Sequence, residues 1–138
     1  MKKHTMIEDI KIPEVKNVTV AVVKDELAEE EDWKVYLLND NEFALENALV
    51  ASKGYGENEG EVQKTSTLRH FIQTVPSKSS AVIEPINPSL FHLNNEYWVS
   101  YYIGERIYDK RFVFLPDSIC DDNLTFIKLL DRKGILHS

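Results

Sequence analysis

The chain has 138 residues, a formal net charge of −7 and a single cysteine, Cys120. Its length predicts one domain that can bury a core, and no apolar run approaches the roughly 20 residues that span a bilayer. The negative charge opposes binding modes that neutralise many phosphates. The lone cysteine excludes an intrachain disulfide. Since no long apolar stretch follows the basic first residues, we expect a cytoplasmic protein that does not associate with a membrane.

The first third of the chain contains two segments in which apolar and polar residues alternate. Residues 1–14 lack such a period and are interpreted as an N-terminal arm. Alternation over 15–24 and 33–38 predicts two strands. The segment between them, 25–32, is strongly acidic, which is typical of a solvated loop; an acidic docking surface is the alternative.

Residues 43–53 fit either a helix or a strand. Good helix formers precede Gly54, and Leu45 and Leu49 are four residues apart, which favours a helix. The same leucines also belong to an alternating pattern, and predicted strands surround the segment, which favours a third strand. Further strands are predicted at 65–75 and 81–86, the second at a sheet edge because it contains Pro85.

The segment 97–114 holds half of the aromatic residues of the chain, so we expect the core to form against it. Gly104 and Glu105 at its centre predict a two-residue type II′ hairpin turn. This turn places Tyr101 opposite Tyr108 and gives the hairpin two faces. The residues expected in the core are Tyr97, Val99, Tyr101, Tyr108, Phe112 and Phe114. The residues expected on a partly exposed face are Trp98, Ser100, Tyr102, Ile107, Asp109 and Arg111. A slip of one residue would exchange the two faces.

The C-terminal residues 118–138 are interpreted as an appendage, in which Asp122 could cap a short helix that carries Leu124, Ile127 and Leu130. Sequential short strands with frequent turns predict an all-β domain over 15–117. We expect an antiparallel two-sheet β-sandwich, immunoglobulin-like in layout, with about seven strands.

No pattern of catalytic, metal or cofactor residues stands out. Cys120 with His137, and His70 with the neighbouring hydroxyl residues, contain the residue types of hydrolases but no local signature of one. The four histidines lack the spacing of metal ligands. We therefore predict no metal, no cofactor and no catalytic site, with a hydrolase that uses His70 or Cys120 as a remote alternative.

Two groups of residues are candidates for binding. The first is the exposed hairpin face, with Trp98, Tyr102, Ile107 and Arg111, whose residue types are common in protein interfaces. The second is a polar patch formed by Lys64, Arg69 and His70. Basic residues beside aromatic ones can hold single-stranded nucleic acid, although the net charge opposes this. Pairing of edge strands is a further route to a partner or a homodimer.

Five blocks of the sequence, in this order, resemble a family of small bacterial proteins of about this length and of unknown function. The blocks are WKVYLLN (33–39), LVASKGYG (49–56), KTSTLRH (64–70), NEYWV (95–99) and YDKRFVF (108–114). Some members carry the name phenylalanyl-tRNA synthetase alpha subunit, which implies a role linked to tRNA. No segment matches the motifs of a class II synthetase catalytic domain, so the resemblance supplies no catalytic residue. Members are rich in valine around positions 49–52, which implies a strand there.

Together these observations predict a cytoplasmic, non-enzymatic protein-interaction or adaptor module, with an unknown protein or a second copy of the chain as its partner. An RNA- or tRNA-associated accessory protein is the alternative.

Overall fold

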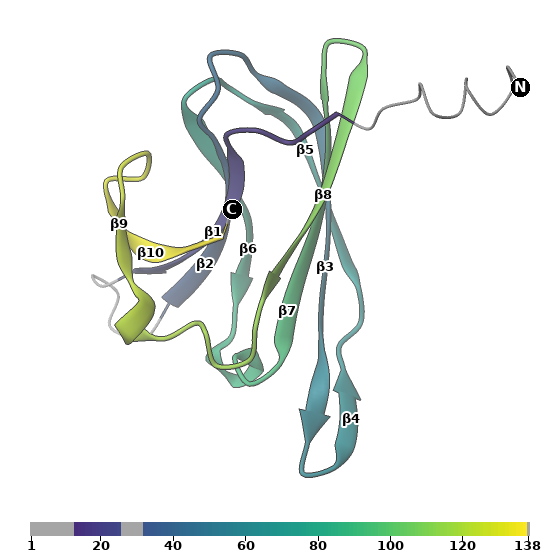
Figure 1. Cartoon of the computed structure of the whole chain (residues 1–138), viewed down its shortest axis with the longest axis vertical. Coiled ribbons are helices and arrows are strands. Elements are labelled where there is room, and N and C mark those ends of the chain that lie inside the picture. The colour runs from purple at the N-terminus through teal and green to yellow at the C-terminus, as the bar shows by residue number, and fades with distance from the viewer. Residues whose placement is uncertain (1–12, 26–31, 138) are drawn as a thin grey trace, which may run out of the picture.

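The computed structural model describes residues 13–25 and 32–137. These residues form an all-β sandwich of two antiparallel sheets with five strands each, as predicted, and Figure 1 shows the two sheets facing each other. The N-terminal arm up to residue 12 and residues 26–31 of the acidic segment lie outside the described residues. In the part of the chain that is described, no helix is long and apolar enough to cross a membrane.

The first sheet has the strand order β6, β2, β1, β10, β9. Its strands are β1 (Val18–Asp25), β2 (Asp32–Asn39), β6 (Ser79–Ile86), β9 (Thr125–Ile127) and β10 (Arg132–His137). The second sheet has the order β4, β3, β7, β8, with β5 also paired to β3. Its strands are β3 (Leu45–Asn58), β4 (Glu61–Lys64), β5 (Leu68–Val75), β7 (Asn94–Ile103) and β8 (Arg106–Phe114). Strands β1, β2 and β6 thus lie in one sheet of the sandwich, and β3, β7 and β8 lie in the other.

The core lies between the sheets and is built from alternate residues of their strands. The largest fully buried side chains of this core are Tyr97, Tyr101, Phe112, Leu37, Leu45, Val20, Val22, Val35, Val50, Val75 and Val99. Aromatic side chains of the β7–β8 hairpin supply the largest of them. The prediction that the core forms against this hairpin is confirmed.

The register of the β7–β8 hairpin is also as predicted. Tyr101 pairs with Tyr108, and their rings stack with centroids 5.3 Å apart. Gly104 has a φ of +62°, whereas Glu105 is not left-handed, as a type II′ turn requires. The predicted core face is therefore inside, and Trp98 and its neighbours lie outside.

The ambiguous segment 43–53 lies largely in a strand, β3, which is the longest of the described strands. It pairs with β5 on one side and β7 on the other, so its backbone groups are satisfied by two neighbours. A register shift against β7 accommodates Asn47, which has a φ of +50°. Pairing on both sides explains why tertiary context overrides the helix propensity of this segment.

The interpretation of 118–138 as an appendage with a short helix is wrong. A 3₁₀ turn at Asp121–Asn123 is followed by β9 and β10, and β10 pairs with β1 inside the first sheet. Ile135 faces the main core, while Ile127 packs on a second apolar cluster over the outer side of the sheet. The segment whose leucine and isoleucine spacing suggested a helix thus forms the β9–β10 hairpin. The described strands number ten rather than about seven.

Candidate functional site

The outer face of the second sheet carries most of the predicted binding residues. Strands β5, β3, β7 and β8 lie side by side, so one row across the sheet joins Arg69, Ala51, Trp98 and Arg111. The next row joins Phe71, Leu49, Ser100 and Asp109. Paired residues share a face of the sheet, so both rows point away from the core.

Large apolar side chains are exposed together on this face. Trp98 is 44% exposed and Phe71 is 64% exposed. Tyr102 pairs with Ile107 near the hairpin turn, and both are also exposed. We call the following group the outer patch: Leu49, Phe71, Trp98, Tyr102 and Ile107. Exposed apolar groups of this kind mark interaction surfaces more often than isolated residues do.

The structure places the predicted residues Trp98, Tyr102, Ile107 and Arg111 together on this face. Sequence reasoning missed Leu49 and Phe71. Their pairing depends on the contact between β3 and β5. The alternation of 65–75 indicates on which face of its strand Phe71 lies, but not which residues of the adjacent strand lie beside it.

Two carboxylates hold the central side chains of this face in place. The indole N–H of Trp98 and the hydroxyl of Ser100 both donate hydrogen bonds to Oδ1 of Asp109. The second carboxylate, Glu96, is almost buried, with 7% of its side chain exposed. Its Oε1 accepts a hydrogen bond from Arg111 at 3.1 Å. These bonds fix the orientation of Trp98 and Arg111 without a ligand.

Glu96 also gathers two side chains from β3. The ammonium of Lys53 lies 3.7 Å from its Oε2, and the hydroxyl of Tyr55 donates to its Oε1 at 3.3 Å. Burial, and then the charge of Glu96, raise the pKa of Tyr55 above its ordinary value. Tyr55 therefore remains a proton donor to Glu96 at neutral pH.

A shallow depression of about 240 Å³ lies over the small side chain of Ala51. Its walls include Trp98 on one side and Arg69 on the other. Whereas Lys53 and Arg111 are paired with Glu96, no ion pair joins Arg69 to any residue within 13–25 or 32–137. The depression thus combines an aromatic wall with a guanidinium that has no ion-pair partner in the described part of the chain.

The structure does not bring the predicted polar patch of Lys64, Arg69 and His70 together. Lys64 ends β4 and pairs with Tyr55, while Arg69 lies on the outer face of β5 opposite Ala51. The side chain of His70 turns to the other side of β5, where it meets Glu84 of the first sheet. Adjacent strand residues point to opposite faces, which separates Arg69 from His70.

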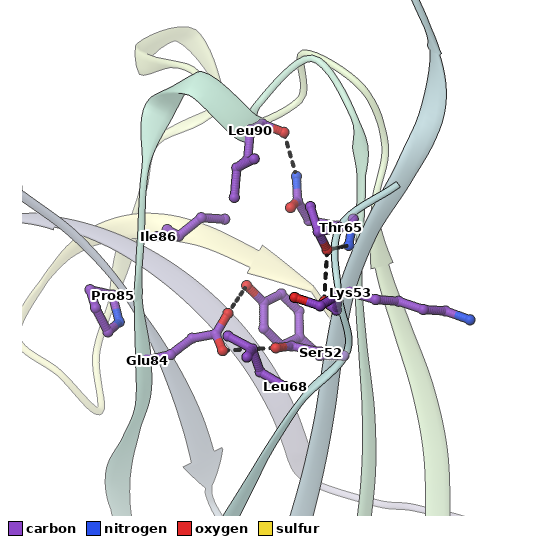
Figure 2. A pocket seen from close by; sticks show the side chains of 12 residues that line it. Ser52, Lys53, Thr65, Leu68, Glu84, Pro85, Ile86 and Leu90 are labelled. Atoms are coloured by element: carbon purple, nitrogen blue, oxygen red, sulfur yellow. Dashed lines mark hydrogen bonds between the residues drawn. The ribbon is translucent and has the colours of Figure 1, made fainter. Parts of the chain in front are cut away.

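Glu84 is the centre of a polar cluster that joins the two sheets (Figure 2). Its Oε1 accepts a hydrogen bond from the Ser52 hydroxyl at 2.8 Å and lies 2.6 Å from Nε2 of His70. Its Oε2 accepts a hydrogen bond from the Tyr97 hydroxyl at 3.2 Å. Ser52, Glu84 and Tyr97 of this cluster line a cavity of about 140 Å³. The labelled side chains of Thr65 and Leu90 also project into it in Figure 2.

The geometry of this cluster is that of a structural bridge. Nucleophilic catalysis by a serine needs a histidine that accepts the proton of the serine hydroxyl. Here Ser52 and His70 both hydrogen-bond to the same oxygen, Oε1 of Glu84. Burial, and then the charge of Glu84, raise the pKa of Tyr97 well above its ordinary value. Tyr97 therefore stays protonated and donates to Glu84. Sequence reasoning gave no signal for Glu84, because its partners come from three other strands.

The remaining predicted candidates lie apart from these two sites. Cys120 precedes the 3₁₀ turn Asp121–Asn123, and His137 packs edge-on against the rings of Phe112 and Phe114. Within the described part of the chain, no group of three His, Cys, Asp or Glu residues could hold a metal ion.

No protein-family model matches the chain, and a comparison with curated proteins gives no match either. No residue role therefore comes to this chain from a relative.

Proposed function

We propose that the chain is a protein-interaction module, acting in the cytoplasm, that binds a partner protein through the outer patch. The observation that supports this is the exposure of five large apolar side chains on adjacent strands, around an anchored Trp98. Trp, Tyr and Arg dominate the binding energy of protein interfaces. The partner surface that fits is apolar at its centre and carries charges of both signs at its rim.

The mixed charge of the face favours a protein over a nucleic acid. Lys53 and Arg111 are already paired with Glu96, and Asp109 lies beside Arg111 on the same strand. A phosphate backbone would meet these carboxylates along with the cations, and the chain as a whole carries a charge of −7. Nucleic-acid binding depends on releasing counterions through uncompensated cations. An RNA or tRNA ligand is therefore the alternative that the experiment below distinguishes from a protein partner.

The anchoring of Trp98 and Arg111 also favours a binding role. Each side chain that is ordered only on association reduces the affinity, by about 0.5–1.5 kcal/mol. Asp109 and Glu96 hold these two side chains before a partner arrives. A surface prepared in this way loses less conformational entropy when it is covered.

The test is affinity capture from native lysate followed by titration with the purified captured protein. The variant Trp98→Ala/Arg111→Ala is compared with Phe126→Ala/Lys133→Ala, which removes an aromatic residue and a cation that pair on the first sheet. Since loss of an interface tryptophan costs about 2 kcal/mol or more, we expect the outer-patch variant to bind at least about 10-fold more weakly. The control variant should bind like the wild type.

Two results would contradict the proposal. Equal affinity of both variants for the purified partner would show that the outer patch is not the binding surface. Capture that disappears after nuclease treatment, together with salt-dependent retention of tRNA on filters, would replace the protein partner with RNA.

A further inference from the structure

Strand β8 is an edge of the second sheet. It pairs with β7 alone among the described strands, over nine residues with no proline and no register shift. Strand β9, which is the end of the opposite sheet, does not pair with it, although Lys110 of β8, Val15 and Phe126 of β9 line a common hollow of about 360 Å³. An edge strand of this kind is a template for pairing with another strand.

The other edges are less suited to pairing. Strand β6 contains Pro85 and is opposite a register shift in β2, and β4 and β9 are short. Strand β5 is regular but carries Arg69 and no acidic residue. Among the described strands, only β8 combines a long, regular edge with charges of both signs, from Arg106 to Arg111.

The turn determines which backbone N–H and C=O groups of β8 point towards its free edge. In a hairpin with a two-residue loop, the closing pair exchanges hydrogen bonds, and the direction of the backbone groups then alternates along the strand. The closing pair here is Ile103 and Arg106. The N–H and C=O groups directed to the free edge therefore belong to Ile107, Asp109, Arg111 and Val113.

The charges on β8 favour one register for a second copy over the two neighbouring registers. Two antiparallel copies of β8 related by a two-fold axis beside Lys110 place Asp109 of each copy opposite Arg111 of the other. An axis beside Asp109 would oppose two carboxylates, and an axis beside Arg111 would oppose two guanidinium groups; both are unfavourable. Asp109 uses only Oδ1 for Trp98 and Ser100, so its second oxygen is available.

Lys110 is compatible with this axis. Its side chain points to the inner side of β8, opposite Val99. Its ammonium lies 5.0 Å from the centre of the Phe112 ring. The charge is therefore displaced from Lys110 towards Phe112 of the same strand. The two ammonium groups of a pair would then lie to either side of the axis.

We propose that two copies of the chain pair through β8, antiparallel and across a two-fold axis beside Lys110, and so extend the second sheet into one continuous sheet. The two outer patches then share one face, which doubles the surface for a partner. The pairing uses the backbone edge of β8 together with Asp109 and Arg111. Its tests measure mass and cross-linking rather than capture of a partner protein, so they do not depend on the function proposed for the outer patch.

The first test is the mass in solution, measured by sedimentation equilibrium from about 1 μM to about 1 mM, where weak association is detected. We expect a monomer–dimer equilibrium. Asp109→Arg and Arg111→Asp should each raise the dimer dissociation constant about 10-fold or more, since two attractive pairs become repulsive. The double variant, which restores opposite charges, should return the constant to near the wild-type value.

The second test fixes the register and does not depend on the charge variants folding. In a Cys120→Ser background, Lys110→Cys should form an intermolecular disulfide under mild oxidation, because non-hydrogen-bonded pairs have Cα atoms about 4.5 Å apart, within disulfide range. Gln73→Cys on the exposed edge of β5 is the control and should cross-link much more slowly.

Two results would overturn the pairing: a protein that remains monomeric at every concentration, or a Gln73→Cys variant that cross-links as fast as the Lys110→Cys variant. A monomer that still loses its partner protein on Trp98→Ala/Arg111→Ala would end this proposal and leave the outer-patch function in place. A β8 dimer that captures no partner protein would support the pairing and contradict the function proposed for the outer patch.

Discussion

The indole N–H of Trp98 on β7 donates a hydrogen bond to Oδ1 of Asp109 on β8, the oxygen that also accepts the hydroxyl of Ser100 at 2.8 Å. A large side chain that is 44% exposed is thereby held in a single orientation. Arg111, its cross-strand neighbour, is held by Glu96 in the same way. The centre of the outer patch is ordered before any partner binds.

We expect Asp109→Ala to release Trp98 without unfolding the protein, because the change removes one exposed acceptor. In protein labelled with 5-fluorotryptophan, the ¹⁹F signal of Trp98 should narrow and shift towards that of free tryptophan. The signal of the buried Trp33 should not move and serves as the internal control. Assignment uses Trp98→Phe, and an unchanged Trp98 signal would show that Asp109 does not restrain the ring.

Glu84→Ala should destabilise the fold, because Ser52, His70 and Tyr97 all lose their acceptor. Leaving a buried donor unsatisfied costs about 1–3 kcal/mol, and we expect a loss in this range in urea unfolding. Glu84→Gln keeps one carbonyl acceptor and should cost less. The exposed Glu61→Ala is the matched control, and should change the free energy of unfolding by less than about 0.5 kcal/mol. Equal effects of Glu84→Ala and Glu61→Ala would contradict the bridging role.

Gly134→Ala tests whether the C-terminal strand is part of the sandwich. A Cβ atom at this position would lie 2.8 Å from the carbonyl oxygen of Val22 and 2.8 Å from the side chain of Ile127. Overpacking of this kind costs about 1–3 kcal/mol, so we expect a lower melting temperature. Gly56→Ala, whose nearest contact would be an ordinary 3.4 Å, should have a smaller effect. A melting temperature unchanged by Gly134→Ala would indicate that β10 does not pack as described.

Buried tyrosines predict a loss of stability at alkaline pH. Burial, with Glu84 beside Tyr97 and Tyr108 beside Tyr101, raises both pKa values well above normal in the folded protein. The unfolded chain ionises near pH 10, so this contribution is complete below about pH 10 and is lost as the pH rises further. Tyr97→Phe should flatten the fall in unfolding free energy above about pH 10. The exposed Tyr102→Phe should leave it unchanged, and identical pH profiles for the two variants would refute the assignment.

The sequence by itself determined the hairpin of 97–114, including its register and its two faces. Both follow from local rules: Gly104 supplies the positive φ of the turn, and alternation assigns each later residue to a side. These local rules suffice to place Trp98, Tyr102, Ile107 and Arg111 on one face of the hairpin. The antiparallel sandwich followed from the succession of such strands.

Tertiary structure alone decided the features that join distant segments. Glu84 meets Ser52 across 32 positions of the sequence, and β10 pairs with β1 from the opposite end of the chain. The same kind of contact made 43–53 a strand and added Leu49 and Phe71 to the outer patch. Local pattern specifies which way a side chain points along its own strand. Which strand lies beside it depends on how the apolar faces of all the strands are buried together, and that is a property of the whole chain.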